Sequence, residues 1–121
     1  MTDVPRLYHL APVGVSLATY RPASLDSEGF THLSTWEQLE TTLNAHFGDV
    51  ESVRLLAFDA ADLGDVVRWE RVATREDRMP HWYGEWDARL VRERSTLDRV
   101  GTVWRISRAT VDDQSDEGVS R

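Results

Sequence analysis

The stretch Val53–Phe58 constrains the fold more than any other part of the sequence. Its residues, Val-Arg-Leu-Leu-Ala-Phe, are apolar on both faces of a strand apart from Arg54. A strand of this kind is typical of the middle of a sheet, where both faces are covered. We therefore predict that Val53–Phe58 is a central strand.

A helix is predicted just before this strand by four apolar residues at helical spacing: Trp36, Leu39, Leu43 and Phe47. Ser34 and Glu37 have the spacing of a capping box, and Thr35 with Gln38 offers the same pairing one residue later. Gly48 is a natural end for this helix.

A turn at Gly29 and a short strand over Phe30–Leu33 lead into the helix start. His32 therefore lies beside the helix N-terminus, where free N–H groups and the helix dipole favour an anion. An imidazole there can donate or accept a hydrogen bond.

The other elements are less regular. Leu7–Leu10 alternates as a strand, with Leu7 and His9 on one face and Tyr8 and Leu10 on the other. The remaining predictions are a short helix at Val13–Thr19 that Gly14 and Val15 disfavour, a helical turn at Ala60–Gly64, a strand at Val66–Glu70, a charged loop at Ala73–Met79, a rigid aromatic segment at Pro80–Gly84, a helix or long excursion at Trp86–Arg94, and a final strand at Thr102–Ile106.

These elements predict one α+β domain over residues 1–108, with one sheet and few helices, followed by an acidic, disordered tail over residues 109–121. The chain of 121 residues contains no cysteine, which excludes disulfides and thiolate chemistry. The net charge of −7 argues against binding to duplex nucleic acid or to a membrane surface. Met1–Pro5 has no signal-peptide pattern, so we expect a cytoplasmic protein, and its oligomeric state is left open.

Three histidines lie in strand-like or aromatic contexts and are candidates for chemistry: His9, His32 and His81. His9 and His32 also have a plain structural interpretation, a half-buried imidazole bonded to a backbone carbonyl. A metal site is disfavoured because no His-x-His or His-Glu-x-x-His pattern is present. Acid–base chemistry is open to any of them, with Ser34 as the obvious hydroxyl. His46 has the pattern of a surface helix residue.

Two carboxylates, Glu70 and Glu85, adjoin tryptophans. Such a carboxylate has a raised pKa where it is desolvated, and the alternative is a charge that faces water. The five tryptophans either wall a pocket for a planar ligand or fill the core.

A further indication comes from several segments taken together: Leu7–Leu10, Tyr20–Leu25, Glu28–Thr35, Gln38–Leu39, Leu55–Asp59, Leu63–Gly64, Arg68–Glu70 and Pro80–Gly84. In their order and spacing they resemble the domain of unknown function 952 family, and Thr96–Ile106 is similar to its closing strand. The resemblance implies an ADP-ribosyltransferase-like fold, a split β-sheet with few short helices that holds NAD in a cleft.

The same resemblance implies roles for individual residues. His9 orients the ribose and carboxamide of NAD, and His32 packs against the nicotinamide. The predicted catalytic residues are His9 and His32, from the resemblance, and Glu70, from its tryptophan neighbour. The predicted cofactor-binding residues are His9, Tyr20, Arg21, His32, Ser34, Thr35, His81 and Tyr83. No glutamate matches the one that stabilises the departing sugar in that superfamily, and Glu85–Ser95 resembles an insertion.

The sequence thus predicts a small-molecule nucleotide ligand, NAD or a relative, in a cleft around His9, His32 and His81. As an enzyme the protein would be a transferase of the ADP-ribosyl type, in which NAD supplies an ADP-ribosyl group or accepts a phosphate. The helix start at Ser34 would then meet a phosphate oxygen. The alternatives are a non-catalytic small-ligand module on the same scaffold and a protein-interaction domain that uses exposed tryptophans.

Overall fold

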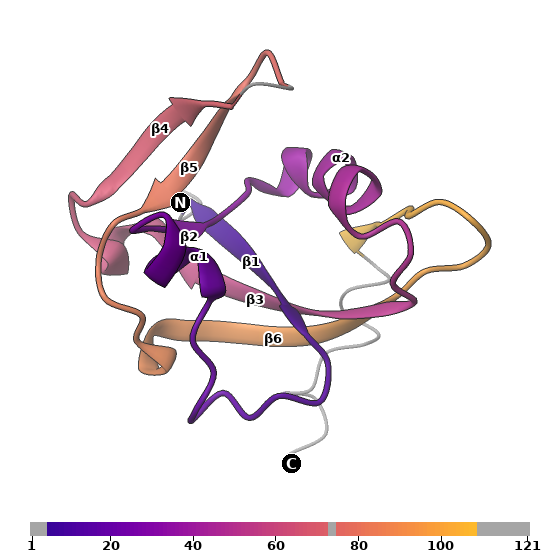
Figure 1. Ribbon diagram of the computed structural model, residues 1–121, viewed down its shortest axis with the longest axis horizontal. Helices are drawn as coiled ribbons and strands as arrows, with labels where there is room; N and C mark the ends of the chain where they lie inside the picture. The colour runs from indigo at the N-terminus through magenta and orange to yellow at the C-terminus, as the bar shows by residue number, and fades with distance from the viewer. Residues whose placement is uncertain (1–4, 73–74, 109–121) are drawn as a thin grey trace.

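Two three-stranded antiparallel sheets organise the computed structural model, which describes residues 5–72 and 75–108 (Figure 1). The first has the order β1–β3–β6, formed by Arg6–Pro12, Ser52–Asp59 and Val91–Asp98. The second has the order β2–β5–β4, formed by Thr31–His32, Arg78–Trp82 and Val67–Arg71. The mixed α+β class is confirmed, while the single sheet predicted from the strand pattern is wrong. The predicted tail at 109–121 lies outside the described residues.

The two sheets meet at one short seam beside β2. The backbone of Tyr8 in β1 exchanges two hydrogen bonds of 2.8 Å with Ser34, which lies two residues after the end of β2. Leu33, which lies between β2 and Ser34, donates its backbone N–H to the carbonyl of Pro80 in β5. The chain from Thr31 to Ser34 therefore crosses from one sheet to the other, and this crossing places His32 next to β1.

The strand β3 is central and buried on both faces, as predicted. On one face it packs with Tyr8 and with Leu39 and Leu43 of α2 (Trp36–His46). On the other it packs with a cluster that includes Leu7 and Trp82. Tyr8 and Leu7 thus bury opposite faces of β1, which confirms the predicted alternation.

The helix α2 begins with the later of the two predicted caps. Thr35 is its N-cap and forms the capping box with Gln38, whose side-chain oxygen accepts from the Thr35 N–H at 3.0 Å. Ser34 is held instead by its backbone pairing with Tyr8. The helix ends at His46, and Phe47 is its C-cap.

The remaining helical elements are short. Ala60–Leu63 forms the predicted turn as a 3-10 helix, η1, and Ala88–Leu90 forms a second one, η2. Val13–Thr19 holds turns rather than a helix. The short helix α1 (Ala23–Ser27) was not predicted; its N-cap is Pro22, in an extended conformation. No helix in the described part of the chain is long and apolar enough to span a membrane.

The predicted final strand at Thr102–Ile106 is wrong, because this segment belongs to neither sheet. The side chain of Asn44 on α2 replaces a strand partner: it accepts from the Trp104 N–H at 2.7 Å and donates to the Trp104 carbonyl at 3.1 Å. The buried indole of Trp104 donates to the carbonyl of Phe47. Its burial against α2 explains the apolar alternation that suggested a strand.

The last strand lies earlier, in the segment predicted to be a helix or an excursion. Within Trp86–Arg94, η2 leads directly into β6, so Val91–Arg94 is part of the first sheet and not an excursion. Charged residues hid this strand, because β6 is an edge strand with one solvated side. Glu93 pairs there with Arg6 at 2.9 Å, and Arg92 pairs with Asp62 at 2.8 Å.

The aromatic segment at Pro80–Gly84 lies mostly in β5, the central strand of the second sheet, and Met79 of the predicted loop lies there too. Pro80 concealed the strand, because a residue without an N–H is unusual in a central strand. Its carbonyl still accepts from Leu33. The strand presents His81 opposite His32 of β2 in register.

Candidate functional site

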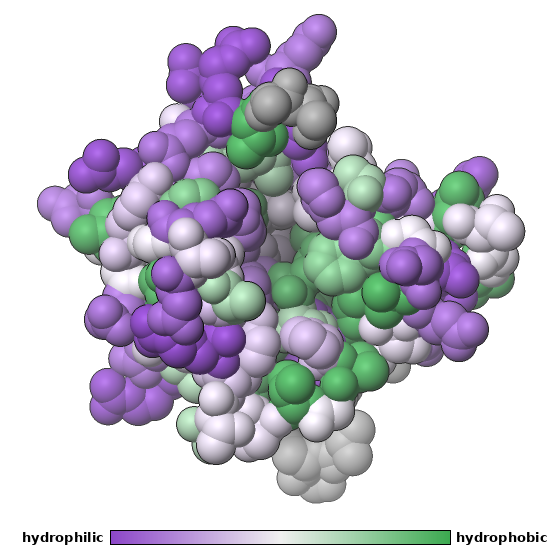
Figure 2. Space-filling model, in the orientation of Figure 1, coloured by the Kyte–Doolittle hydropathy of each residue, from purple (hydrophilic) through white to green (hydrophobic). Residues whose placement is uncertain are grey.

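A cavity of about 530 Å³ opens between α1, α2 and the seam of the two sheets. Figure 2 shows this face of the molecule hollowed between its purple outer rims. Eighteen residues line the cavity: Tyr8, His9, Leu10, Tyr20, Pro22, Ala23, Ser24, Glu28, His32, Leu33, Ser34, Thr42, His46, Phe47, Val72, Arg75, Met79 and His81. All four histidines of the chain are among them.

His9 is the most constrained of these side chains. It is buried on β1, its Nδ1 lies 2.9 Å from the carbonyl oxygen of His32, and its Nε2 lies 2.7 Å from the hydroxyl of Tyr20. A carbonyl oxygen only accepts, so Nδ1 carries the proton and Nε2 accepts from Tyr20. Burial lowers the pKa of His9 to about 4, so the ring is neutral at physiological pH.

Tyr20 consequently meets the cavity as a hydrogen-bond acceptor. Its proton is directed at His9, and burial raises the pKa of the phenol to about 12, so it stays protonated. The lone pairs of its oxygen are the polar feature that this pair offers to a ligand. His9 therefore acts on the cavity through Tyr20.

His32 sits at the mouth, with its side chain 52% exposed. Its Nε2 lies 2.7 Å from a carboxylate oxygen of Glu28, four residues earlier, on the other side of the turn at Gly29. A carboxylate only accepts, so Nε2 of His32 is the donor. Gly29 makes this turn with φ of 89°, a conformation that favours glycine.

His81 is 3% exposed and stacks on Phe30, with ring centroids 4.1 Å apart. Its Nδ1 lies 2.7 Å from Glu70, which also accepts from the Tyr83 hydroxyl at 2.7 Å. These bonds, that from Tyr83 first, hold the pKa of Glu70 below its usual range and keep it ionised, so of the two interpretations of this carboxylate the raised pKa does not hold. Nδ1 of His81 is then the donor, and in the described part of the chain its buried Nε2 has no hydrogen-bond partner.

The structure brings together five of the predicted site residues in this cavity: His9, Tyr20, His32, Ser34 and His81. The other four lie elsewhere. Glu70 and Tyr83 sit behind His81, Thr35 caps α2, and Arg21 forms exposed ion pairs with Asp26 and Glu85. No tryptophan lines the cavity, and Trp82 and Trp104 fill the core.

Six other lining side chains carry polar groups and were not among the predicted site residues: Tyr8, Ser24, Glu28, Thr42, His46 and Arg75. Thr42 and His46 are four residues apart on α2, so their shared face was visible in the helical spacing. Arg75 had no local signal, because its position depends on the β4–β5 hairpin. Within residues 5–72 and 75–108, no group of three acidic or histidine side chains is arranged to hold a metal ion.

Together, the fold and this cavity define a small two-sheet α+β protein with a histidine-lined pocket at the junction of its sheets. The chain belongs to the protein family of unknown function DUF952, whose sequence profile matches residues 15–94.

Solved structures with the same architecture come from protein CC0527 of Caulobacter crescentus. Its crystal structure has 27% sequence identity and a TM-score of 0.70, covering 81% of this chain and 90% of that one. Its solution NMR structure has 28% identity and a TM-score of 0.66 over the same shares. No curated protein matches the sequence.

Proposed function

We propose that the protein binds NAD or a related nucleotide in the histidine-lined cavity, as an ADP-ribosyltransferase-like domain. The observation that carries the proposal is the convergence of His9, His32 and His81 on one cavity of about 530 Å³. This volume lies within the range of small-molecule and cofactor sites. The split into two sheets, with the cavity at their junction, accords with the fold that the family resemblance implies.

The polar groups of the cavity suit the carboxamide and ribose of such a ligand. Tyr20 offers lone pairs, Glu28 offers a carboxylate, and both accept from amide or hydroxyl groups. His9 fixes the direction of the Tyr20 hydroxyl and stays neutral. In this proposal Tyr20, rather than His9 itself, meets the ligand at this end of the cavity.

Catalysis of ADP-ribosyl transfer would depend on placement and electrostatics, because nicotinamide is a fair leaving group. One feature favours a second candidate function, a binding module without catalysis. Among the lining residues within 5–72 and 75–108, the only carboxylate is Glu28, and it is engaged with His32. Glu70, the predicted catalytic acid, lies behind His81 and holds that ring in place.

Calorimetric titration with NAD, ADP-ribose and nicotinamide tests the proposal. We expect NAD to bind, and we expect His9→Ala and His32→Ala to weaken its binding. Tyr20→Phe removes the accepting oxygen and keeps the ring that packs on Trp86, so it should weaken NAD binding about five- to tenfold. Tyr83→Phe is the matched control, since its hydroxyl faces Glu70 outside the cavity.

Absence of NAD binding up to millimolar concentrations would refute the proposal, and equal effects of the two tyrosine variants would refute the assigned site. Release of nicotinamide during prolonged incubation distinguishes an enzyme from a binder. A bound nucleotide that stays intact would favour the binding module.

A further inference from the structure

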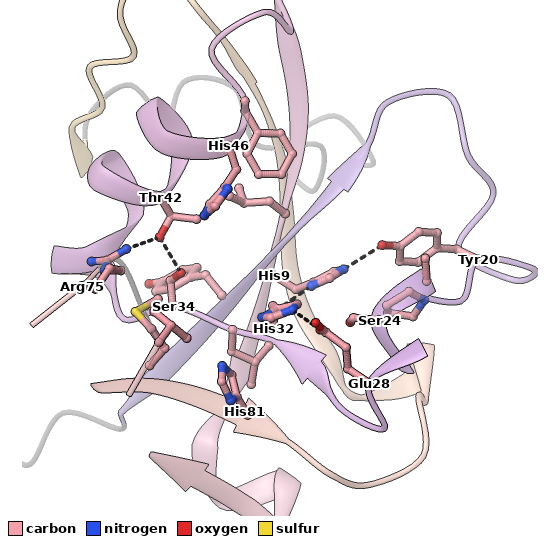
Figure 3. Close-up of a pocket in the computed structure, with 18 residues that line it drawn as sticks. His9, Tyr20, Ser24, Glu28, His32, Ser34, Thr42, His46, Arg75 and His81 are labelled. Atoms are coloured by element: carbon pink, nitrogen blue, oxygen red, sulfur yellow. Dashed lines mark hydrogen bonds and ion pairs between the residues drawn. The ribbon is translucent and has the colours of Figure 1, made fainter. Parts of the chain in front are cut away.

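The polar groups of the cavity are divided between its two ends (Figure 3). Tyr20 and Glu28 lie at one end and present acceptors. Arg75 and Thr42 lie at the other end, where the guanidinium donates to the threonine hydroxyl at 2.9 Å. A ligand that fills the cavity therefore meets acceptors at one end and donors at the other.

Arg75 is held in a fixed orientation by Asp77. Its Nε and Nη2 each form a hydrogen bond to Asp77, at 2.8 Å and 2.9 Å, and its side chain is only 12% exposed. Asp77 in turn accepts from Gln38 at 2.9 Å, and Gln38 is fixed by the Thr35 N–H and the Arg78 carbonyl. The bond from Arg75 holds the pKa of Asp77 below its usual range, so this support stays ionised.

Arg75 is also one of the residues that line the cavity. A guanidinium has five N–H groups, and the bonds to Asp77 and Thr42 use three of them. Thr42 accepts from Arg75, and its oxygen lies 3.3 Å from that of Ser34. Either hydroxyl can donate to the other, so one proton of this pair is left for a ligand. His46, one helical turn beyond Thr42, also lines this end.

Among the lining residues in the described part of the chain, Glu28 is the only carboxylate, and it lies at the opposite end. Asp77 is not a lining residue and meets the guanidinium from the side away from the cavity. An anion in the corner formed by Arg75, Thr42, Ser34 and His46 would therefore meet donors. The guanidinium of Arg75, oriented by Asp77 and next to the Thr42 hydroxyl, can donate hydrogen bonds to the oxygens of a phosphoryl group.

We propose that this corner of Arg75, Thr42, Ser34 and His46 is a phosphate-binding subsite that takes the phosphoryl groups of the ligand. The inference rests on the proposed function to the extent that the corner belongs to the same cavity. It fixes the direction of the ligand, with phosphates toward Arg75 and the donor groups of its sugar or amide toward Tyr20. It also extends the ligand class to phosphorylated compounds that end in a hydroxyl or amide.

Titration calorimetry of the full chain with pyrophosphate, and separately with inorganic phosphate, tests the subsite without NAD. We expect pyrophosphate to bind, Arg75→Gln to raise its Kd at least about tenfold, and Thr42→Val to raise it about threefold. Arg94→Gln is the matched control, because it removes the same charge from an exposed position on β6 and should leave the Kd unchanged. If Arg75→Gln fails to fold by circular dichroism, Thr42→Val decides the test.

Three outcomes would overturn the inference. They are no pyrophosphate binding at millimolar concentrations, equal weakening by Arg94→Gln, and tighter binding of a dicarboxylate such as malonate. Its failure is distinguishable from that of the proposed function. Pyrophosphate binding without NAD binding would refute the nucleotide proposal alone, and NAD binding that Arg75→Gln leaves unchanged would refute the subsite alone.

Discussion

Among single residues, His9 is the one whose lowered pKa most affects how stability depends on pH. Both its ring nitrogens are bonded inside the protein, and its burial excludes the charged form until the pH falls to about 4. An unfolded histidine takes up its proton near 6.5. Between these values the unfolded state binds more protons, so stability falls as the pH falls.

We predict that His9 lowers the free energy of unfolding by about 3 kcal/mol as the pH drops from 6.5 to about 4. Urea unfolding of the wild type and of His9→Asn across this range measures the effect, because asparagine keeps a donor for the His32 carbonyl and does not titrate. Carboxylates with lowered pKa, such as Asp77, lose stabilisation in both proteins, so the difference isolates His9. Parallel curves would contradict the assigned neutral state.

At the scale of elements, the start of α2 links the helix to the second sheet. Gln38 accepts from Thr35 and donates both to Asp77 and to the carbonyl of Arg78 in β5. The helix start therefore fixes the support of Arg75 as well as its own first turn. The sequence showed a capping box here but left two registers open, because Ser34 and Thr35 both have an acceptor partner three residues later.

Replacing Gln38 with alanine should lower the free energy of unfolding by about 1–2 kcal/mol, since three partly exposed hydrogen bonds are lost. Thr41→Ala, at an exposed position of the same helix, should change it by less than about 0.5 kcal/mol. Guanidinium chloride midpoints of the two variants provide the comparison. Equal midpoints would mean that Gln38 does not connect the helix to the sheet.

The elements that the sequence predicted well are those with a periodic pattern of their own. The central strand at Val53–Phe58 and the helix behind Thr35 are both set by local apolar spacing. The strand β6 and the segment around Trp104 were misassigned, because side chains from distant elements satisfy them. The same holds for the cavity: the sequence indicated its histidines, but it did not indicate Arg75, whose position depends on contacts with distant residues.

At the scale of the whole molecule, the segment around Trp104 closes the core over α2. Its indole is 1% exposed, packs with Leu43 and Leu97, and is bonded to the carbonyl of Phe47. Asn44 satisfies the backbone of Trp104 on both sides. One residue outside both sheets thus joins α2 to the core of the first sheet.

We predict that Trp104→Ala lowers the free energy of unfolding by about 3–5 kcal/mol, as expected for truncation of a buried indole. Val103→Ala is the neighbouring control, because Val103 is 45% exposed, and its effect should stay below about 1 kcal/mol. Urea denaturation followed by circular dichroism measures both. A small effect at Trp104 would mean that this segment does not belong to the cooperative core.

We propose that the histidine-lined cavity of this molecule takes a nucleotide of the NAD type. The most direct test is a titration of the isotope-labelled protein with NAD, followed by amide chemical shifts in NMR. We predict saturable shifts grouped around the cavity, at His9, Tyr20, His32 and Thr42, with the exposed edge at Trp69 unchanged. No shifts at millimolar NAD, or shifts confined to the Trp69 edge, would contradict the account.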